Sequence, residues 1–292
     1  MTTLMLMLPF FLLFAWLFLS IRLIQRRGRR SPINENILRT PGHSLRRVQT
    51  SNAIDLMGYL FGVIMVPFFG YAAYKSANPN IYLIAIPTIL MTGWVFYKAI
   101  KTFGLAIRLH QGLDAEITSG QELNLLMRDG AWVYHDIPYQ YGNIDHVIVG
   151  TGGIFAVETK GISKPTDNKS SPSENSTVKV ERDELILPHA RTGKPIQQAK
   201  THAKWLRGEI QRRFDLTVPV RAVVALPGWM IKRGFDGDCW VINPKRGNSL
   251  RGAVTKQLVG EKEIQMVAAW IEDLARSVAP KSKEFDQKRE ME

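Results

Sequence analysis

Two carboxylates and a lysine are spaced along the chain so that a β-hairpin would gather them on one face. Residues 143–160 alternate like two strands around a glycine-rich loop at 150–153. Counting outward from that loop sets Asp145 directly opposite Glu158, and opposed residues share a face with β-carbons about 5 Å apart. Lys160 lies two residues beyond Glu158 and points to the same side. The spacing therefore predicts a cluster of these three side chains in an apolar stretch.

Such a cluster has two interpretations. Two carboxylates this close repel each other unless a cation or the lysine offsets their charge. Mg²⁺ prefers oxygen ligands and suits a carboxylate pair, and Mn²⁺ accepts the same ligands. A buried ion pair beside a solvated carboxylate would also satisfy the pattern. Geometry alone leaves both interpretations open.

The sequence around this cluster resembles the core of the nuclease-related domain (NERD) family, which is similar to the PD-(D/E)xK nucleases. The resemblance is carried by residues 144–160, by Glu116 in a glycine-containing helix start, and by residues 195–199. The last segment is similar to the family's Asn-Pro-x-x-Gln, although Lys194 replaces the Asn. In total the resemblance covers about residues 112–277.

The resemblance implies roles for the clustered residues. Asp145 and Glu158 would hold Mg²⁺ or Mn²⁺, with the main-chain carbonyl of Thr159 as a third ligand. Lys160 would orient the attacking water and offset negative charge that builds on the phosphate.

Other polar residues are open to plainer interpretations. The resemblance implies that Glu116 completes or orients the site and that Gln198 holds Lys160 or a phosphate oxygen, but either could be a solvated side chain. His146 falls on the other sheet face and is expected to be a core histidine. A charged stripe at helical spacing could track phosphates or simply be solvated: Lys200, Lys204, Arg207 and Gln211.

The function implied by the resemblance is metal-dependent hydrolysis of nucleic-acid phosphodiester bonds, with DNA expected ahead of RNA as the substrate. Two other functions stay open. The domain could bind nucleic acid or protein without cutting it, or it could recruit partners as a membrane scaffold. The two opposed carboxylates favour catalysis, because binding alone does not need them.

The charge of the chain says little about nucleic-acid binding. The formal net charge is +12. Residues 1–110 hold 12 Lys or Arg and 2 Asp or Glu, whereas residues 111–292 hold 26 and 24. The basic excess thus belongs to the N-terminal part, and the nearly neutral remainder slightly favours a non-catalytic role. The one cysteine, Cys239, excludes an intramolecular disulfide and a cysteine-based metal site, and a buried position in a strand is expected for it.

The pattern after residue 103 predicts an α/β domain, and the resemblance implies a restriction-endonuclease-like mixed sheet flanked by helices. Apolar or alternating runs predict strands besides the hairpin, and helical periodicity or a leading proline predicts helices. The expected strands are 132–134, 178–180, 185–187, 218–226 and 240–242, and the expected helices are 104–127, 195–214 and 261–277.

Three long apolar runs precede this domain and predict three transmembrane helices, at about residues 4–21, 54–74 and 81–100. Each run approaches the length of about 20 residues that a bilayer requires. Pro67 and Pro87 lie inside the second and third runs, where membrane helices tolerate proline. A helix lying on the membrane surface is the alternative for the first run.

Arginine placement predicts how these helices are oriented. Residues 22–47 contain eight arginines, and the loop between the second and third runs contains none. The positive-inside rule places the first loop in the cytoplasm, so the N-terminus faces outward and everything after Lys101 is cytoplasmic. The expected organisation is a membrane module at 1–103 in the inner (cytoplasmic) membrane, a nuclease-like domain at 104–279 and a charged, disordered tail at 280–292.

Overall fold

The described part of the chain forms two compact units. Residues 54–103 belong to the first, and residues 36–53 together with 104–278 form the second. The second unit therefore begins before the two apolar runs and resumes after them, at residue 104. The computed structural model describes residues 36–77, 80–165, 174–236, 238–246 and 248–278, with positions 16 and 19.

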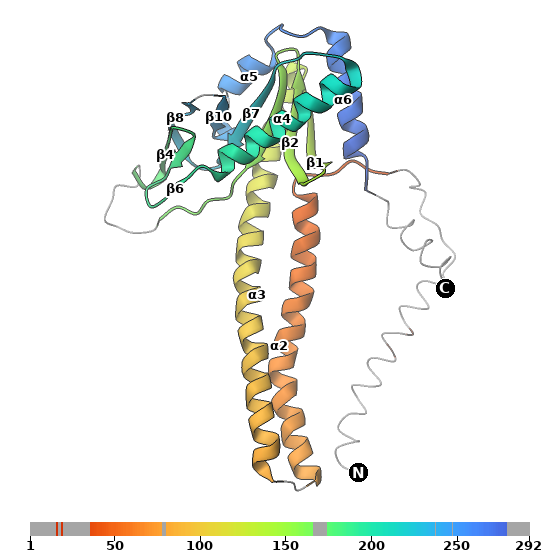
Figure 1. Cartoon of the computed structure of the whole chain (residues 1–292), viewed down its shortest axis with the longest axis vertical. Helices are drawn as coiled ribbons and strands as arrows, with labels where there is room; N and C mark the ends of the chain where they lie inside the picture. The colour runs from red at the N-terminus through yellow and green to blue at the C-terminus, as the bar shows by residue number, and fades with distance from the viewer. Residues whose placement is uncertain are drawn as a thin grey trace. The chain divides into compact units, whose positions relative to one another are not determined.

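Two long helices carry the apolar runs of the first unit, α2 (His43–Ala77) and α3 (Ile81–Asn124) (Figure 1). Both are long and apolar enough to cross a membrane, and many of their large apolar side chains are exposed. Small residues let the helices approach closely, since a Cβ at Gly70 would lie 2.5 Å from the Thr88 hydroxyl oxygen. These features agree with two of the three predicted membrane helices. The first, at 4–21, lies outside the described residues apart from positions 16 and 19.

Helix α3 is longer than the sequence predicts. A boundary is expected near residue 103, but one helix continues to Asn124. Gly120 interrupts the apolar stripe in the sequence without ending the helix. A Cβ there would lie 2.5 Å from Pro41 and 3.3 Å from the His146 ring, so this glycine serves close packing and not a turn.

A six-stranded mixed sheet forms the centre of the second unit, in the order β1-β2-β3-β7-β10-β9. The first three strands are antiparallel neighbours, whereas β3, β7 and β10 run parallel. The predicted mixed α/β class is confirmed, and the restriction-endonuclease-like arrangement stays a prediction. The strands are β1 (Trp132–Tyr139), β2 (Gly142–Gly150), β3 (Gly153–Thr159), β7 (Val220–Ala225), β10 (Cys239–Ile242) and β9 (Phe235–Asp236).

Helices cover both faces of this sheet. On one face lie α4 (Lys194–Phe214) and α6 (Glu261–Ala275), whose apolar sides join the larger buried cluster (Figure 1). The end of α3, η1 (Leu125–Asp129) and α5 (Asn248–Val254) pack against the other face around Phe155. Strands covered on both faces carry continuous apolar runs, as β3 and β7 do.

A second sheet of four strands has the order β6-β5-β4-β8. The predicted strands at 178–180 and 185–187 are confirmed by β4 and β5, which pair antiparallel. Strands β6, β8 and β9 and helix α5 escape prediction, because segments this short show too little periodicity. The strands are β4 (Thr177–Glu181), β5 (Glu184–Ile186), β6 (Arg191–Thr192) and β8 (Met230–Arg233), and two short turns are η2 (Glu174–Ser176) and η3 (Pro244–Arg246).

The first residues of the second unit hold its sheet through a buried ion pair. Arg39 Nη1 donates to the Asp136 carboxylate at 2.9 Å, and the Ser44 hydroxyl donates to the same oxygen at 2.7 Å. Asp136 is buried and has a left-handed φ of 53°. Ile37 pairs with Val278, so the two ends of the unit lie side by side.

We expect Arg39→Ala to lower the free energy of unfolding by about 1–3 kcal/mol, because it leaves the buried Asp136 carboxylate without its cation. Urea unfolding of the full chain in mild detergent, followed by tryptophan fluorescence, measures this. Arg46→Ala is the matched control, since Arg46 is exposed on the same segment. Equal losses in the two variants would contradict the assignment.

Candidate active site

The β2–β3 hairpin has the predicted register. His146 pairs with Val157, and one further step along the ladder sets Asp145 opposite Glu158. The Asp145 carboxylate accepts a hydrogen bond of 2.6 Å from the main-chain N–H of Thr159. The hairpin thus fixes the first carboxylate beside the backbone that carries the second.

Lys160 joins three segments at the end of β3. Its main-chain N–H donates to Ala225 at 3.0 Å, which extends the parallel pairing with β7 by one residue. Its ammonium lies 2.5 Å from Glu158 Oε1 and 3.1 Å from Gln198 Oε1. The expected contact between Gln198 and Lys160 is thus present. Pro195 lies in the first turn of α4, and this start of the helix places Gln198 one turn further along.

His202 is a site residue that the sequence pattern did not reveal. It follows Gln198 by one helical turn and is fully buried. Its Nδ1 lies 3.3 Å from Glu158 Oε2, and its Nε2 lies 3.2 Å from the Tyr139 hydroxyl. Burial, with Lys160 as a smaller cause, lowers the pKa of His202 to about 4, so the ring is neutral near pH 7.

The second oxygen of Glu158 has no hydrogen-bond partner within the described chain. Although His202 Nδ1 is near, the contact lacks hydrogen-bond geometry, and both atoms are buried and unsatisfied. An unpaired buried carboxylate oxygen is costly. This atom is available to a ligand that enters the site.

Glu116 reaches the cluster from α3. The helix approaches closely, since a Cβ at Gly161 would lie 2.6 Å from the Gln111 carbonyl oxygen. Glu116 is buried, and burial followed by the nearby Asp136 and Glu158 carboxylates raises its pKa to about 7. A backbone hydrogen bond from Gly42, whose φ of 70° suits glycine, acts in the opposite direction.

The pKa values of the other two carboxyl groups, Asp145 and Glu158, are raised as well. Burial, then repulsion from Glu158 and Glu116, raises the pKa of Asp145 well above its ordinary value. Burial also raises the pKa of Glu158, and Lys160 partly offsets this effect. Carboxylates with such pKa shifts gain from any cation that joins them.

The comparison with known protein families agrees with this geometry. Residues 111–227 match the family model of the nuclease-related domain, NERD. The NERD match begins at Gln111 in α3 and ends just after β7, so it spans every residue of the predicted site. Strands β8 to β10 and helices α5 and α6 lie beyond it. No curated protein and no solved structure matches the chain.

Two predictions about residues outside the candidate site, His146 and Cys239, are confirmed. His146 is a buried core histidine on the opposite face, where its Nδ1 lies 2.9 Å from His135 Nδ1. Cys239 is a buried, free thiol in β10, and burial raises its pKa to about 12. Neither group points to chemistry of its own.

The metal ligands stay a prediction. Within the described ranges, no three His, Cys, Asp or Glu side chains are grouped to hold a metal ion. The predicted set needs only Asp145 and Glu158 with the Thr159 carbonyl, and hard cations take such carboxylate and carbonyl oxygens. The unsatisfied Glu158 Oε2 and the raised carboxyl pKa values fit a divalent cation.

We expect the metal-free protein to lose stability as the pH rises from about 4.5 to about 7 through Glu116. A carboxyl whose pKa is raised in the folded chain binds its proton more tightly there than in the unfolded chain. In EDTA, Glu116→Gln should therefore melt about 2–8 °C higher than wild type at pH 8 and no higher at pH 4.5. Glu122→Gln on the same helix is the control. A gain for Glu116→Gln that is equal at both pH values would refute the assignment.

Proposed function

We propose that this protein is a membrane-anchored, metal-dependent nuclease that hydrolyses phosphodiester bonds of nucleic acid, DNA before RNA, at the cytoplasmic face. One observation carries the proposal. Within a NERD match, Lys160 contacts both Glu158 and Gln198, beside a second carboxylate, Asp145, that the hairpin register brings to the same end of β3. An ordinary ion pair would not need this arrangement.

Asp145 and Glu158 would hold Mg²⁺ or Mn²⁺ through their carboxylates, with the Thr159 carbonyl as the third protein ligand. The bound ion supplies Lewis-acid stabilisation of charge on the phosphate. The Thr159 N–H fixes one Asp145 oxygen and leaves the other for binding. Glu158 offers its unpartnered Oε2.

Lys160 is the residue that acts on the reacting groups. Its side chain is 34 % exposed while Glu158 is 2 % exposed, so the ammonium reaches toward solvent from a buried anchor. There it can orient a water molecule and offset charge that develops on the phosphate. Gln198 holds the ammonium from the other side through its amide oxygen, which makes it a positioning residue. His202 is a buried, neutral neighbour of Glu158, and Glu116 is a carboxylate that repels Asp145.

Membrane attachment is supported by α2 and α3, which are long and apolar enough to span a bilayer. Their exposed apolar side chains suit lipid better than water. The eight arginines of residues 22–47 favour a cytoplasmic position for that loop and hence for the NERD region.

We expect Asp145→Asn and Glu158→Gln each to abolish Mg²⁺-dependent cleavage of a labelled oligonucleotide by the full chain in detergent. Both should also lose most of the rise in melting temperature that Mg²⁺ gives the wild type, because ligand binding to the native state raises its stability. Lys160→Ala should keep that rise and lose cleavage by about 100-fold or more. Glu181→Gln, an exposed carboxylate of β4, is the control for charge removal alone.

Two outcomes would count against catalysis. If neither Mg²⁺ nor Mn²⁺ shifts the wild-type melting point and no DNA or RNA is cut, the site does not work as a nuclease. If Asp145→Asn lowers stability in EDTA as much as in Mg²⁺, the carboxylate serves an ordinary structural contact.

We further expect the C-terminus to face the cytoplasm. A reporter that fluoresces only in the cytoplasm should be active when fused after Glu292, and a reporter that works only outside should be inactive there. The same pair of reporters fused at residue 79, between α2 and α3, should give the reverse pattern. Activity of the external reporter after Glu292 would overturn the orientation.

A non-catalytic module that binds nucleic acid or protein is the second candidate. It is favoured by the nearly neutral charge of residues 111–292. In that case oligonucleotide binding would persist in Asp145→Asn and Lys160→Ala without any cleavage by the wild type.

A further inference from the structure

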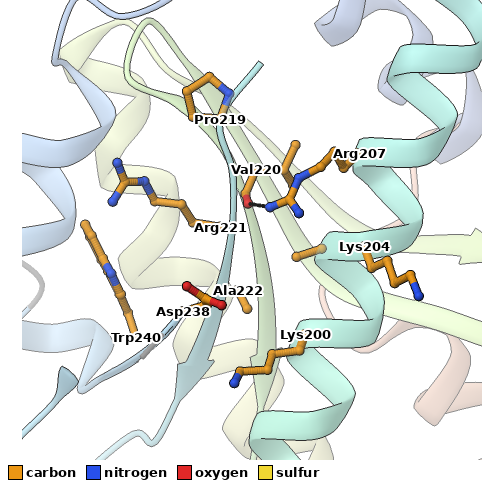
Figure 2. Close-up of a pocket in the computed structure, with 10 residues that line it drawn as sticks. Lys200, Lys204, Arg207, Pro219, Val220, Arg221, Ala222, Asp238 and Trp240 are labelled. Atoms are coloured by element: carbon orange, nitrogen blue, oxygen red, sulfur yellow. Dashed lines mark hydrogen bonds between the residues drawn. The ribbon is translucent and has the colours of Figure 1, made fainter. Parts of the chain in front are cut away.

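A basic hollow of about 500 Å³ lies along α4 and the free edge of β7 (Figure 2). Lys200, Lys204 and Arg207 line it from α4, whereas Arg221 and Trp240 line it from β7 and β10 and lie on the other side of the β7 ribbon in Figure 2. The cations therefore come from two elements that are separate in sequence. The remaining lining residues are Ala203, Pro219, Val220, Ala222 and Asp238.

The hollow exists because β10 is shorter than β7. Pairing between the two begins at Cys239 opposite Ala222, so the first residues of β7 have no strand on that side within the described chain. Arg207 uses this open edge and donates to the Val220 carbonyl at 2.7 Å. The arginine is thereby fixed at the wall of the hollow.

Besides Arg207, two of the four basic side chains that line the hollow have a partner, and the hollow keeps more positive than negative groups. The Arg221 guanidinium lies 5.1 Å from the centre of the Trp240 ring, and Lys200 pairs with Asp183 at 2.6 Å. In the part of the chain that is described, Lys204 forms no ion pair. Four cations thus line the hollow with one carboxylate, Asp238. Such a group of like charges gains from an anion.

This hollow is separate from the candidate active site around Asp145, Glu158 and Lys160. An α-helix turns by about 100° per residue, so Lys200, Lys204 and Arg207 lie about 120–180° around α4 from Gln198. His202, by contrast, lies on nearly the same side as Gln198 and contacts Glu158. Helix α4 therefore presents one flank to the carboxylates and the other to the basic hollow.

We infer that this hollow is a binding site for the phosphate groups of a nucleotide. Arginine forks and lysine ammonium groups are the side chains that bind phosphate oxygens best. The Asp238 carboxylate accepts hydrogen bonds, which suits a ligand that also carries hydroxyl or amino donors, as nucleotides do. The volume lies in the range of small-ligand pockets. Both a free nucleotide and a nucleotide unit of a longer strand offer this chemistry.

Direct binding to the full chain in detergent tests the inference. ATP, inorganic pyrophosphate and a 12-nucleotide single strand are titrated by calorimetry, in EDTA so that no divalent ion can bridge phosphate to the NERD carboxylates. The double variant Lys204→Gln/Arg221→Gln removes two cations and spares Arg207, which holds the strand edge. Lys204→Gln alone guards against a folding defect, since among the described residues its ammonium forms no ion pair that the change would remove. Lys262→Gln, an exposed lysine of α6, is the matched control.

We expect the double variant to bind at least one probe tenfold or more weakly than wild type, and Lys204→Gln to show a smaller loss with a salt slope reduced by about one. Lys262→Gln should bind like wild type. Loss of ATP and pyrophosphate binding would identify a free nucleotide as the ligand, and loss of strand binding alone would identify nucleic acid. The inference is overturned if no probe binds the wild type, or if the pocket variants bind every probe as tightly as Lys262→Gln does. Cleavage is not measured, so the result is independent of the proposed nuclease activity.

Discussion

The contact between Lys160 and Glu158 is the interaction on which the candidate site depends. Glu158 is buried among apolar strands, where a lone carboxylate would bind a proton and lose its charge. The lysine ammonium at 2.5 Å opposes that tendency. It also faces solvent, so the same charge that stabilises the buried glutamate is within reach of a substrate. One ion pair thereby links the core of the sheet to its surface.

The surrounding fold can be understood as the means of holding this pair at the end of β3. The parallel pairing with β7 continues through the Lys160 N–H, and α4 brings Gln198 and His202 against the two side chains. The α3 helix adds Glu116 from a third direction, because Gly161 lets it approach the chain directly after the lysine. Residues from β2, β3, α4 and α3 therefore meet at the site. Hydrogen bonds or the absent side chain of Gly161 allow each of them to come close.

Much of this could be predicted from the sequence, since it depended on local patterns. The period-two alternation and the glycine loop gave the hairpin register and with it the position of Asp145 opposite Glu158. The proline in the first turn of α4 predicted the helix that carries Gln198. What escaped prediction depended on long-range packing. His202 looks like any helical histidine until the helix is packed on the sheet, and the basic hollow depends on β10 beginning only opposite Ala222, one residue past Arg221. The continuity of α3 was missed because a change from apolar to polar composition resembles a boundary although the backbone does not break.

The arrangement of the second unit has a consequence for how the chain could be remodelled. Residues 36–53 and 104–278 form one unit, and the hydrogen bond of 3.3 Å between Gln49 and His110 shows that its two pieces contact each other. The apolar hairpin is thus an insertion in sequence between two segments of one domain. A chain cut before residue 104 would lose Arg39 and with it the ion pair to Asp136. In modular terms, the segment ahead of the hairpin belongs to the domain that follows the hairpin.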